Sequence, residues 1–257
     1  MPIDFPLVFR IAGLSVSAHL VLETLAFITG YQYYLKLRSR TKDPIDDANR
    51  IWIFIGAAAG AFIFSRLIGA LESPSAFFKS DHPMLYLFSS KTIIGGLLGG
   101  LLGVELIKKI VGEKNSSGDL FTFPLILALI IGRTGCFLNG VYEPTFGLET
   151  SWFTGMDLGD GKMRHPVALY EIVFLILLWI SLAAVSKKMT LVSGEKFKLF
   201  MIAYLVFRFF LEFIKPRETV LSGLSTIQLC CLAGIFYYRK PIFTWISKPF
   251  RIAAYGQ

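Results

Sequence analysis

Seven long apolar runs dominate this chain of 257 residues. A helix needs about 20 predominantly apolar residues to cross the hydrocarbon core of a bilayer, and each run is close to that length. None alternates apolar and polar residues as a strand of a membrane barrel would. We therefore predict an all-α, polytopic membrane bundle that forms one domain over residues 1–257. The predicted spans are 17–35, 51–71, 91–107, 120–138, 167–185, 197–214 and 219–238.

The composition excludes an ordinary soluble enzyme and a disordered chain. Hydrophobic residues make up 54% of the sequence and charged residues only 17%, whereas soluble domains carry about 25% charged residues. In a membrane protein the net charge of +8 first reflects topology, so no nucleic-acid partner is expected. Three cysteines are too few for a disulfide framework. The N-terminus lacks the pattern of a cleavable signal peptide, so we expect the first span to be retained.

Lysine and arginine are distributed unevenly between the predicted loops. With the N-terminus outside, sixteen of them fall in cytoplasmic loops and six on the opposite side. Basic residues collect in cytoplasmic loops, so we predict that the N-terminus lies outside and the C-terminus inside. The last members of the cytoplasmic set are Arg239, Lys240, Lys248 and Arg251.

One outer loop, residues 139–166, is unusually long for a connection in a compact bundle. Loops longer than about 15 residues without clear secondary structure are often functional. The loop contains Gly155, Gly159 and Gly161 within 152–166, so we expect turns there rather than a helix.

Ionisable residues within membrane spans are costly and tend to mark functional sites. In the predicted topology nearly all of them lie in the outer half of the bundle. Glu105 is the exception, because it follows Lys91 by 14 residues, about 21 Å along a helix. The outer set comprises His19, Glu23, Arg66, Lys91, Arg133, His165, Tyr170, Glu171, Arg208 and Glu212.

Arginine suits phosphate recognition, because its planar guanidinium donates two parallel hydrogen bonds. Arg133 and Arg208 are therefore candidate ligands for a lipid phosphate at head-group depth. The alternative is that they form structural ion pairs with Glu212 or Glu143, or bind helix ends. For Arg66 the alternative is snorkelling or pairing with Glu72.

His19 and Glu23 are four residues apart, so they share one helix face. They are candidates for an acid–base pair that lines the outer cavity. A metal site could use this pair together with His165, but no H-E-x-x-H motif is present, and we predict no metal. A third alternative is a hydrogen-bonded histidine at the membrane interface.

Glycine recurs throughout the third span, in the stretch 95–103. No Walker lysine follows it, so it is not a nucleotide-binding loop. Small residues four apart, such as Gly95, Gly99 and Gly103, allow close approach of a neighbouring helix. They would alternatively leave room for a lipid chain.

Three segments together resemble a known family, the prolipoprotein diacylglyceryl transferases. Residues 132–140, GRTGCFLNG, followed by Glu143 and Gly147, are similar to the signature G-R-x-G-N-F-x-N-x-E-x-x-G. Residues 165–171, HPVALYE, look like the family's H-P-x-x-L-Y-E. The pattern of Tyr204, Arg208 and Glu212 before Lys215-Pro216 resembles that near the family's sixth span.

The resemblance implies a multi-pass enzyme of the bacterial inner membrane. Such an enzyme moves the diacylglyceryl group of phosphatidylglycerol to the lipobox cysteine of a preprolipoprotein at the outer leaflet, and glycerol phosphate leaves. It implies that Arg133 and Arg208 hold the phosphate. It further implies that Asn139, Tyr204 and Glu212 shape the site, and that no metal or nucleotide cofactor is needed. We also assign Glu143, His165 and Tyr170 to the substrate-binding set.

The sequence departs from the family pattern at three places. The histidine that precedes the glycine pair of the third span is Ile94 here, and the signature asparagine is Cys136. The signature glutamate aligns with Val141, so Glu143 is displaced by two residues. We expect Lys91 or His19 to compensate, with Glu23 and Tyr204 completing the catalytic set.

These departures leave two alternatives to a diacylglyceryl transferase. One is an enzyme of the same fold with a different acceptor or reaction, using His19, Glu23 and Lys91. The other is a non-catalytic phospholipid-binding protein, although the inverted repeats common in transporters are not apparent.

Overall fold

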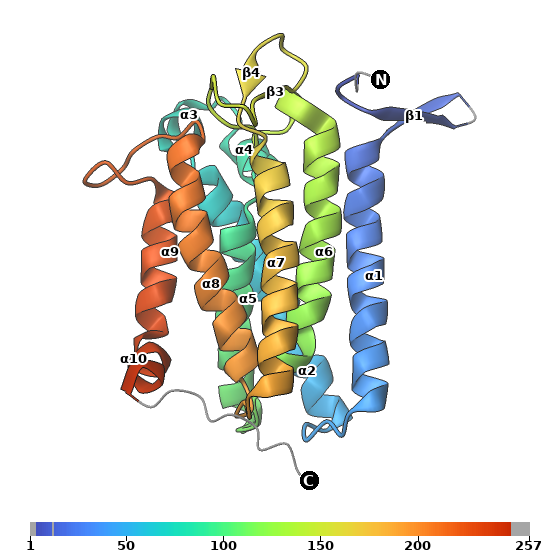
Figure 1. Ribbon diagram of the computed structural model, residues 1–257, viewed down its shortest axis with the longest axis vertical. Helices are drawn as coiled ribbons and strands as arrows, with labels where there is room; N and C mark the ends of the chain where they lie inside the picture. The colour runs from blue at the N-terminus through green and yellow to red at the C-terminus, as the bar shows by residue number, and fades with distance from the viewer. Residues whose placement is uncertain (1–3, 12, 248–257) are drawn as a thin grey trace.

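The computed structural model describes residues 4–11 and 13–247 of the chain. Long helices run side by side along the longest axis of the molecule (Figure 1). They are α1 (Ala18–Arg40), α2 (Asp47–Ala70), α5 (Ile93–Val111), α6 (Asp119–Asn139), α7 (Val167–Lys188), α8 (Glu195–Leu211) and α9 (Thr226–Tyr237). Each predicted span thus contains a helix.

Short elements gather at one end of the bundle, called here the hairpin end (Figure 1). Strands β1 (Val8–Ile11) and β2 (Leu14–Ser17) pair antiparallel, as do β3 (Met156–Asp157) and β4 (Met163–Arg164). Helices α3 (Pro74–Lys79) and α4 (Pro83–Ser89) lie at the same end, each with proline at its first position. The remaining elements are η1 (Gly140–Tyr142), η2 (Glu212–Ile214) and α10 (Arg239–Ser247).

Among the described residues, three helical segments are long and apolar enough to cross a membrane by length and composition. They are Asp47–Ala70, Asp119–Tyr142 and Val167–Lys188, and the apolar helix Thr226–Tyr237 is shorter. Large apolar side chains point outward from the bundle, including Phe27, Phe62 and Ile110. An apolar exterior is the arrangement that lipid surroundings favour, because lipid rather than water contacts these side chains.

The seventh predicted span begins too early. Residues 219–225 form a tight turn, closed by an isolated antiparallel bridge between Leu221 and Leu224, and α9 starts only at Thr226. Ser225 and Gln228 form a capping box, in which the side chain of each accepts a hydrogen bond from the backbone N–H of the other. This box satisfies the first free amides of the helix and fixes its start. The sixth span likewise changes from α-helix to 3₁₀-helix at Glu212.

Glycines set the contact between α2 and α5, the most extensive helix pair of the bundle. A Cβ atom on Gly99 would lie 2.3 Å from the carbonyl oxygen of Gly60, and one on Gly103 would lie 2.0 Å from that of Gly56. Only glycine tolerates such an approach. The glycine stretch therefore serves close helix packing, and its Gly95, Gly99 and Gly103 face α2 rather than a lipid chain.

Buried side chains of α5–α9 form the core of the bundle. Ile94, Ile126, Leu175, Phe200 and Tyr204 are each fully buried within it. At the end opposite the hairpins, Asp43 accepts hydrogen bonds from Arg38 and Arg50 and joins α1 to α2. Burial raises the pKa of the Asp43 carboxyl, but the contacts from Arg50, the Ile45 amide and Arg38 together outweigh it, so the net pKa is lowered. Two basic residues of the predicted cytoplasmic set, Lys248 and Arg251, lie outside the described residues.

Candidate active site

Arg133, Glu171 and Tyr204 form a buried polar cluster toward the hairpin end, one residue from each of α6, α7 and α8. Their exposed fractions are 7%, 0% and 0%. Arg133 Nε lies 2.8 Å from Glu171 Oε1, as an ion pair without hydrogen-bond alignment. The Tyr204 hydroxyl donates to the same oxygen over 2.5 Å. Because an isolated buried charge is costly, this pairing accounts for an arginine inside the bundle.

Arg208 lies one helical turn after Tyr204 on α8. Its Nη2 donates to Glu212 Oε2 over 3.2 Å, and both side chains are buried. Arg133 pairs directly with Glu171, whereas Arg208 pairs with Glu212 and lies within electrostatic reach of both Glu171 and Arg133. Arg208 Nε and Glu171 Oε2 are buried without a hydrogen-bond partner in the described residues. The cluster therefore keeps donor capacity for an anionic ligand.

The ion pairing foreseen as the alternative for the intramembrane arginines is present in both cases. Arg208 pairs with Glu212, as that alternative named, whereas Arg133 pairs with Glu171 rather than with Glu143 or Glu212. The pairing leaves the unused N–H donor of Arg208 described above. Ion pairing and phosphate binding are thus compatible in this cluster.

The suggested pairing of Arg66 with Glu72 is wrong. Arg66 Nη1 donates to the carbonyl oxygen of Ser90 over 3.2 Å, and its guanidinium lies over the ring of Phe62. Glu72 instead lies 3.1 Å from Nζ of the buried Lys215, which is also 4.0 Å from Glu212. Lys215 thus extends the charged cluster to the end of α2.

A second, more exposed group of charged residues surrounds His19 at the start of α1. Lys91 Nζ donates to both carboxylate oxygens of Glu23, over 2.7 and 2.8 Å. His19 Nε2 lies 3.6 Å from Glu23 and 3.7 Å from Glu143. Asn139 Nδ2 donates to Glu143 over 3.4 Å. The structure therefore brings together five of the residues assigned to the site.

Lys91 reaches this group from outside α5, because the helix begins only at Ile93. The predicted span 91–107 therefore starts two residues too early. Lys91 therefore does not lie on the helix that carries Ile94. Ile94 instead lies fully buried in the same cluster as Tyr204.

His165 and Tyr170 lie apart from the His19 group. His165 Nδ1 and the Tyr170 hydroxyl are 3.1 Å apart, and this hydroxyl is 2.6 Å from Thr154 Oγ1. These contacts tie the long loop to the start of α7. Within the described residues, no three His, Cys, Asp or Glu side chains are grouped to hold a metal ion, so the metal alternative with His165 gains no support.

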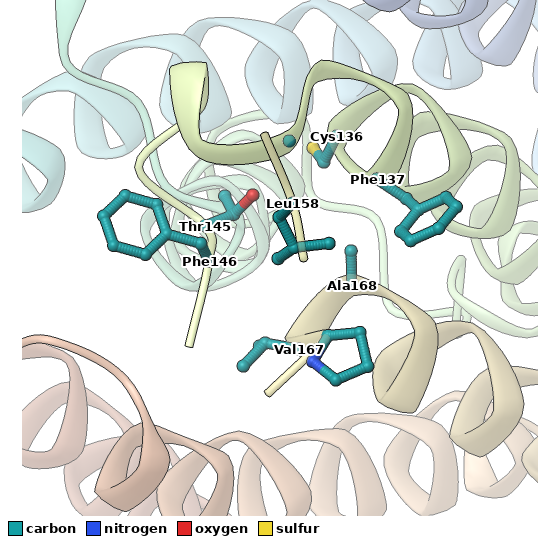
Figure 2. A pocket seen from close by; sticks show the side chains of 9 residues that line it. Cys136, Phe137, Thr145, Phe146, Leu158, Val167 and Ala168 are labelled. Carbon is teal, nitrogen blue, oxygen red and sulfur yellow. The ribbon is translucent and has the colours of Figure 1, made fainter. Parts of the chain in front are cut away.

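Cys136, where the resembling signature has asparagine, lies between the two charged groups. Its Sγ is 3.7 Å from Arg133 Nη1, and its thiol also interacts with the His19 ring. Cys136 lines a small, mostly apolar pocket beneath the long loop, together with Phe137, Phe146, Leu158 and Val167 (Figure 2). The structure thus places a thiol beside a buried guanidinium and an imidazole.

The long loop folds over this end of the bundle as turns and the β3–β4 hairpin, in agreement with the prediction. Lys162 Nζ lies 2.5 Å from Glu149 Oε1, and this hydrogen bond lowers the pKa of the Glu149 carboxyl. The hydrogen bond from Arg164 lowers the pKa of Asp160 in the same way. Both carboxylates are therefore charged in the folded loop at neutral pH.

A family model described as prolipoprotein diacylglyceryl transferase matches residues 6–239. The chain belongs to this family. A prolipoprotein diacylglyceryl transferase family member of Oleidesulfovibrio alaskensis, named phosphatidylglycerol–prolipoprotein diacylglyceryl transferase, is 29% identical over 239 residues, 86% of this chain and 83% of the relative. A protein of the same name from Staphylococcus aureus is 26% identical over 255 residues, 90% of this chain and 84% of the relative. No solved structure matches significantly.

Membership of the prolipoprotein diacylglyceryl transferase family, together with the apolar helices, makes the chain a multi-pass membrane protein. Two buried residues of its charged cluster, Glu171 and Lys215, were given no catalytic or binding role from the sequence, although Glu171 belongs to the outer set of ionisable residues. Both stand in the motifs that carry the family resemblance, at the end of HPVALYE and before Pro216. An acidic residue buried in an apolar span is itself a signal, because it needs a cationic partner.

Proposed function

We propose that this protein is a phospholipid-dependent transferase that moves the diacylglyceryl group of phosphatidylglycerol to an acceptor thiol. The observation that carries the proposal is the pair of buried arginines at one end of the bundle, Arg133 bound to Glu171 and Arg208 bound to Glu212. Membership of the transferase family supports the donor lipid and the acceptor class. By this proposal the natural acceptor is the lipobox cysteine of a preprolipoprotein signal peptide.

In the proposed reaction the acceptor thiol loses its proton and its sulfur attacks the glyceryl carbon next to the phosphate. The new S–C bond forms as the C–O bond to the phosphate breaks, and glycerol phosphate leaves with the electron pair. Arg133 and Arg208 bind the phosphate and stabilise the charge that develops on it. Proton removal falls to His19, whose Nε2 lies 3.6 Å from Glu23 and 3.7 Å from Glu143.

The other assigned residues support this chemistry from further away. Tyr204 is fully buried and bonded to Glu171, so we propose that it positions this carboxylate rather than reacting itself. Lys91 holds Glu23, and Asn139 holds Glu143. Glu212 orients Arg208. His165 and Tyr170 anchor the long loop over the site.

We further propose that the chain is one integral membrane domain with seven spans and that the hairpin end faces outward. The N-terminus is then outside, the C-terminus inside, and the site lies at the outer leaflet of the bacterial inner membrane. The unequal distribution of basic residues supports this orientation. Reporter fusions after Gly112 and after Gly223 test it. The first should report the cytoplasm and the second the outside, and the reverse would contradict the orientation.

One observation favours a second candidate, an enzyme of the same fold with a different acceptor. Ile94 occupies the position of the family pattern's histidine and is buried in an apolar cluster, so no imidazole acts from that helix. His19 with Glu23 and Lys91 would then define a changed acceptor site. A third possibility, a phospholipid-binding protein without catalysis, predicts no product at all.

Complementation separates these candidates. The gene is expressed in a bacterium depleted of its own prolipoprotein diacylglyceryl transferase, and the mass of a reporter lipoprotein is measured. The proposal predicts growth and the mass increase of one diacylglyceryl group. No modification by a well-expressed protein would contradict the lipoprotein acceptor, and a lipid change in a deletion strain without lipoprotein change would favour the second candidate.

A further inference from the structure

Cys136 stands on the last turns of α6, at the point where the two charged groups of the site meet. Its side chain is 9% exposed, and its Sγ lies 3.7 Å from Nη1 of Arg133. It also lines the pocket beneath the long loop (Figure 2). A thiol in this place is beside the guanidinium that, in the proposed function, binds the donor phosphate.

The start of α1 packs closely against α6 beside the thiol. Gly135 permits this packing, because a Cβ atom there would lie 3.3 Å from the backbone of His19. His19 interacts with Cys136 and carries Glu23 and Glu143 at 3.6 and 3.7 Å from its Nε2. A thiol, an imidazole and an orienting carboxylate are the groups that activate a sulfur nucleophile.

The same cluster points to an anionic ligand beside the thiol. Arg133 and Arg208 are both more than nine-tenths buried. Arg208 Nε lacks a hydrogen-bond partner in the described residues, whereas Arg133 Nε faces Glu171 Oε1 at 2.8 Å. Buried guanidinium N–H groups normally find an acceptor. A phosphate bound by Arg133 would stand next to Cys136 Sγ, because Nη1 of Arg133 is 3.7 Å from that sulfur.

We propose that Cys136 is itself an acceptor, so that the protein forms a thioether between its own Cys136 and a diacylglyceryl group. This inference rests on the proposed function, because it uses the same donor lipid and the same bond change. His19 takes the thiol proton, the Cys136 sulfur bonds to the glyceryl carbon, and the C–O bond to phosphate breaks. Glycerol phosphate leaves with the electron pair. The product places a lipid anchor inside the site and competes with modification of an external thiol.

Mass spectrometry of the full-length protein tests this inference. The purified protein is incubated with phosphatidylglycerol vesicles and a synthetic lipobox peptide in one mixture, and both masses are followed. We expect the protein to gain one diacylglyceryl group, located after proteolysis on the fragment that contains Cys136. The adduct should resist neutral hydroxylamine, because a thioether is not cleaved as a thioester is.

Cysteine and arginine variants, together with the mass of the lipobox peptide, separate the outcomes. Cys136→Ser should remove the adduct, whereas Cys230→Ser, a matched change at a free cysteine outside the site, should keep it at the wild-type rate. Arg133→Gln should slow its formation about 100-fold. If the synthetic lipobox peptide is modified while Cys136 stays unmodified, this inference is overturned and the proposed function is left intact. A hydroxylamine-sensitive adduct, or one on Cys230 or Cys231, also overturns it, and modification of neither thiol overturns both.

Discussion

Arg133 and Glu171 form a buried ion pair between α6 and α7, with 2.8 Å between Nε and Oε1. The two residues are far apart in the sequence, and their pairing joins the motif of residues 132–140 to that of residues 165–171. Tyr204 of α8 completes the contact through Oε1. Three helices are therefore fixed relative to one another by a single carboxylate, and the arginine that we assign to the phosphate is oriented by it.

The variant Glu171→Gln should destabilise the protein by about 3–5 kcal/mol, because it leaves the Arg133 charge buried without a counter-ion. Thermal unfolding in detergent measures the change. Glu105→Gln is the matched control, since Glu105 is half exposed at the opposite end, and it should change stability by less than about 1 kcal/mol. The double variant Arg133→Gln, Glu171→Gln should recover part of the loss. Equal effects of Glu171→Gln and Glu105→Gln would contradict the pairing.

The variant Tyr204→Phe should cost about 1.5–3 kcal/mol, because it removes a hydrogen bond to a charged group that is fully buried. Because we assign Tyr204 a positioning role, Tyr204→Phe should also lower the rate of lipid transfer without abolishing it. Tyr31→Phe, at an exposed tyrosine of α1, serves as the control and should leave both measurements unchanged. If Tyr204→Phe behaves like Tyr31→Phe, the proposed role of Tyr204 fails.

The variant Gly99→Ala should destabilise the α2–α5 contact by about 1–3 kcal/mol, because the added methyl group overlaps the backbone of Gly60. Gly100→Ala on the same helix meets only ordinary contacts at 3.5 and 3.6 Å. It should be neutral or gain up to about 1 kcal/mol from helix propensity. Thermal unfolding of the two variants side by side checks the difference, and similar midpoints would argue against close packing.

The long outer loop should lose order in acid. Glu149 and Asp160 have lowered pKa values in the folded loop, because Lys162 and Arg164 bond to them. A lowered pKa stabilises the loop above the unfolded pKa, about 4.3 for Glu and 3.9 for Asp. This stabilisation is lost as pH falls through the folded values.

Hydrogen exchange of the Thr150 amide, which donates to Met163, measures this opening once the intrinsic pH dependence is subtracted. Its protection should fall as the pH drops below about 4. The variant Glu149→Gln should show a weaker pH dependence than wild type. If the protection stays constant down to the lowest pH measured, these ion pairs do not stabilise the loop.

The helices could be predicted from sequence because each depends on a local property, an apolar run of sufficient length. The start of α9 was misplaced although Ser225 and Gln228 form a recognisable capping box, because residues 219–224 are also partly apolar. The β1–β2 hairpin and the short helices α3 and α4 were not predicted. Their segments are too short for a periodic pattern to stand out.

The candidate site was predictable as a set of residues but not as a set of contacts. The depth of Arg133 and Arg208 follows from their places in the spans. Their partners depend on how α6, α7 and α8 pack together, which no local pattern encodes. The contact between Lys91 and Glu23 could not be predicted for the same reason, because it joins α1 to the segment before α5. The predicted span also included Lys91, whereas α5 begins two residues later, at Ile93.

The most direct test of the account is the initial rate at which purified protein transfers diacylglyceryl from phosphatidylglycerol vesicles to a lipobox peptide, read from the mass of the peptide. We predict a thioether-linked product, with Arg133→Ala and Arg208→Ala each slowing its formation about 100-fold. Arg10→Ala, at an exposed arginine of β1, should leave the rate unchanged. The absence of product from folded wild-type protein, or equal rates for the Arg133→Ala, Arg208→Ala and Arg10→Ala variants, would contradict the account.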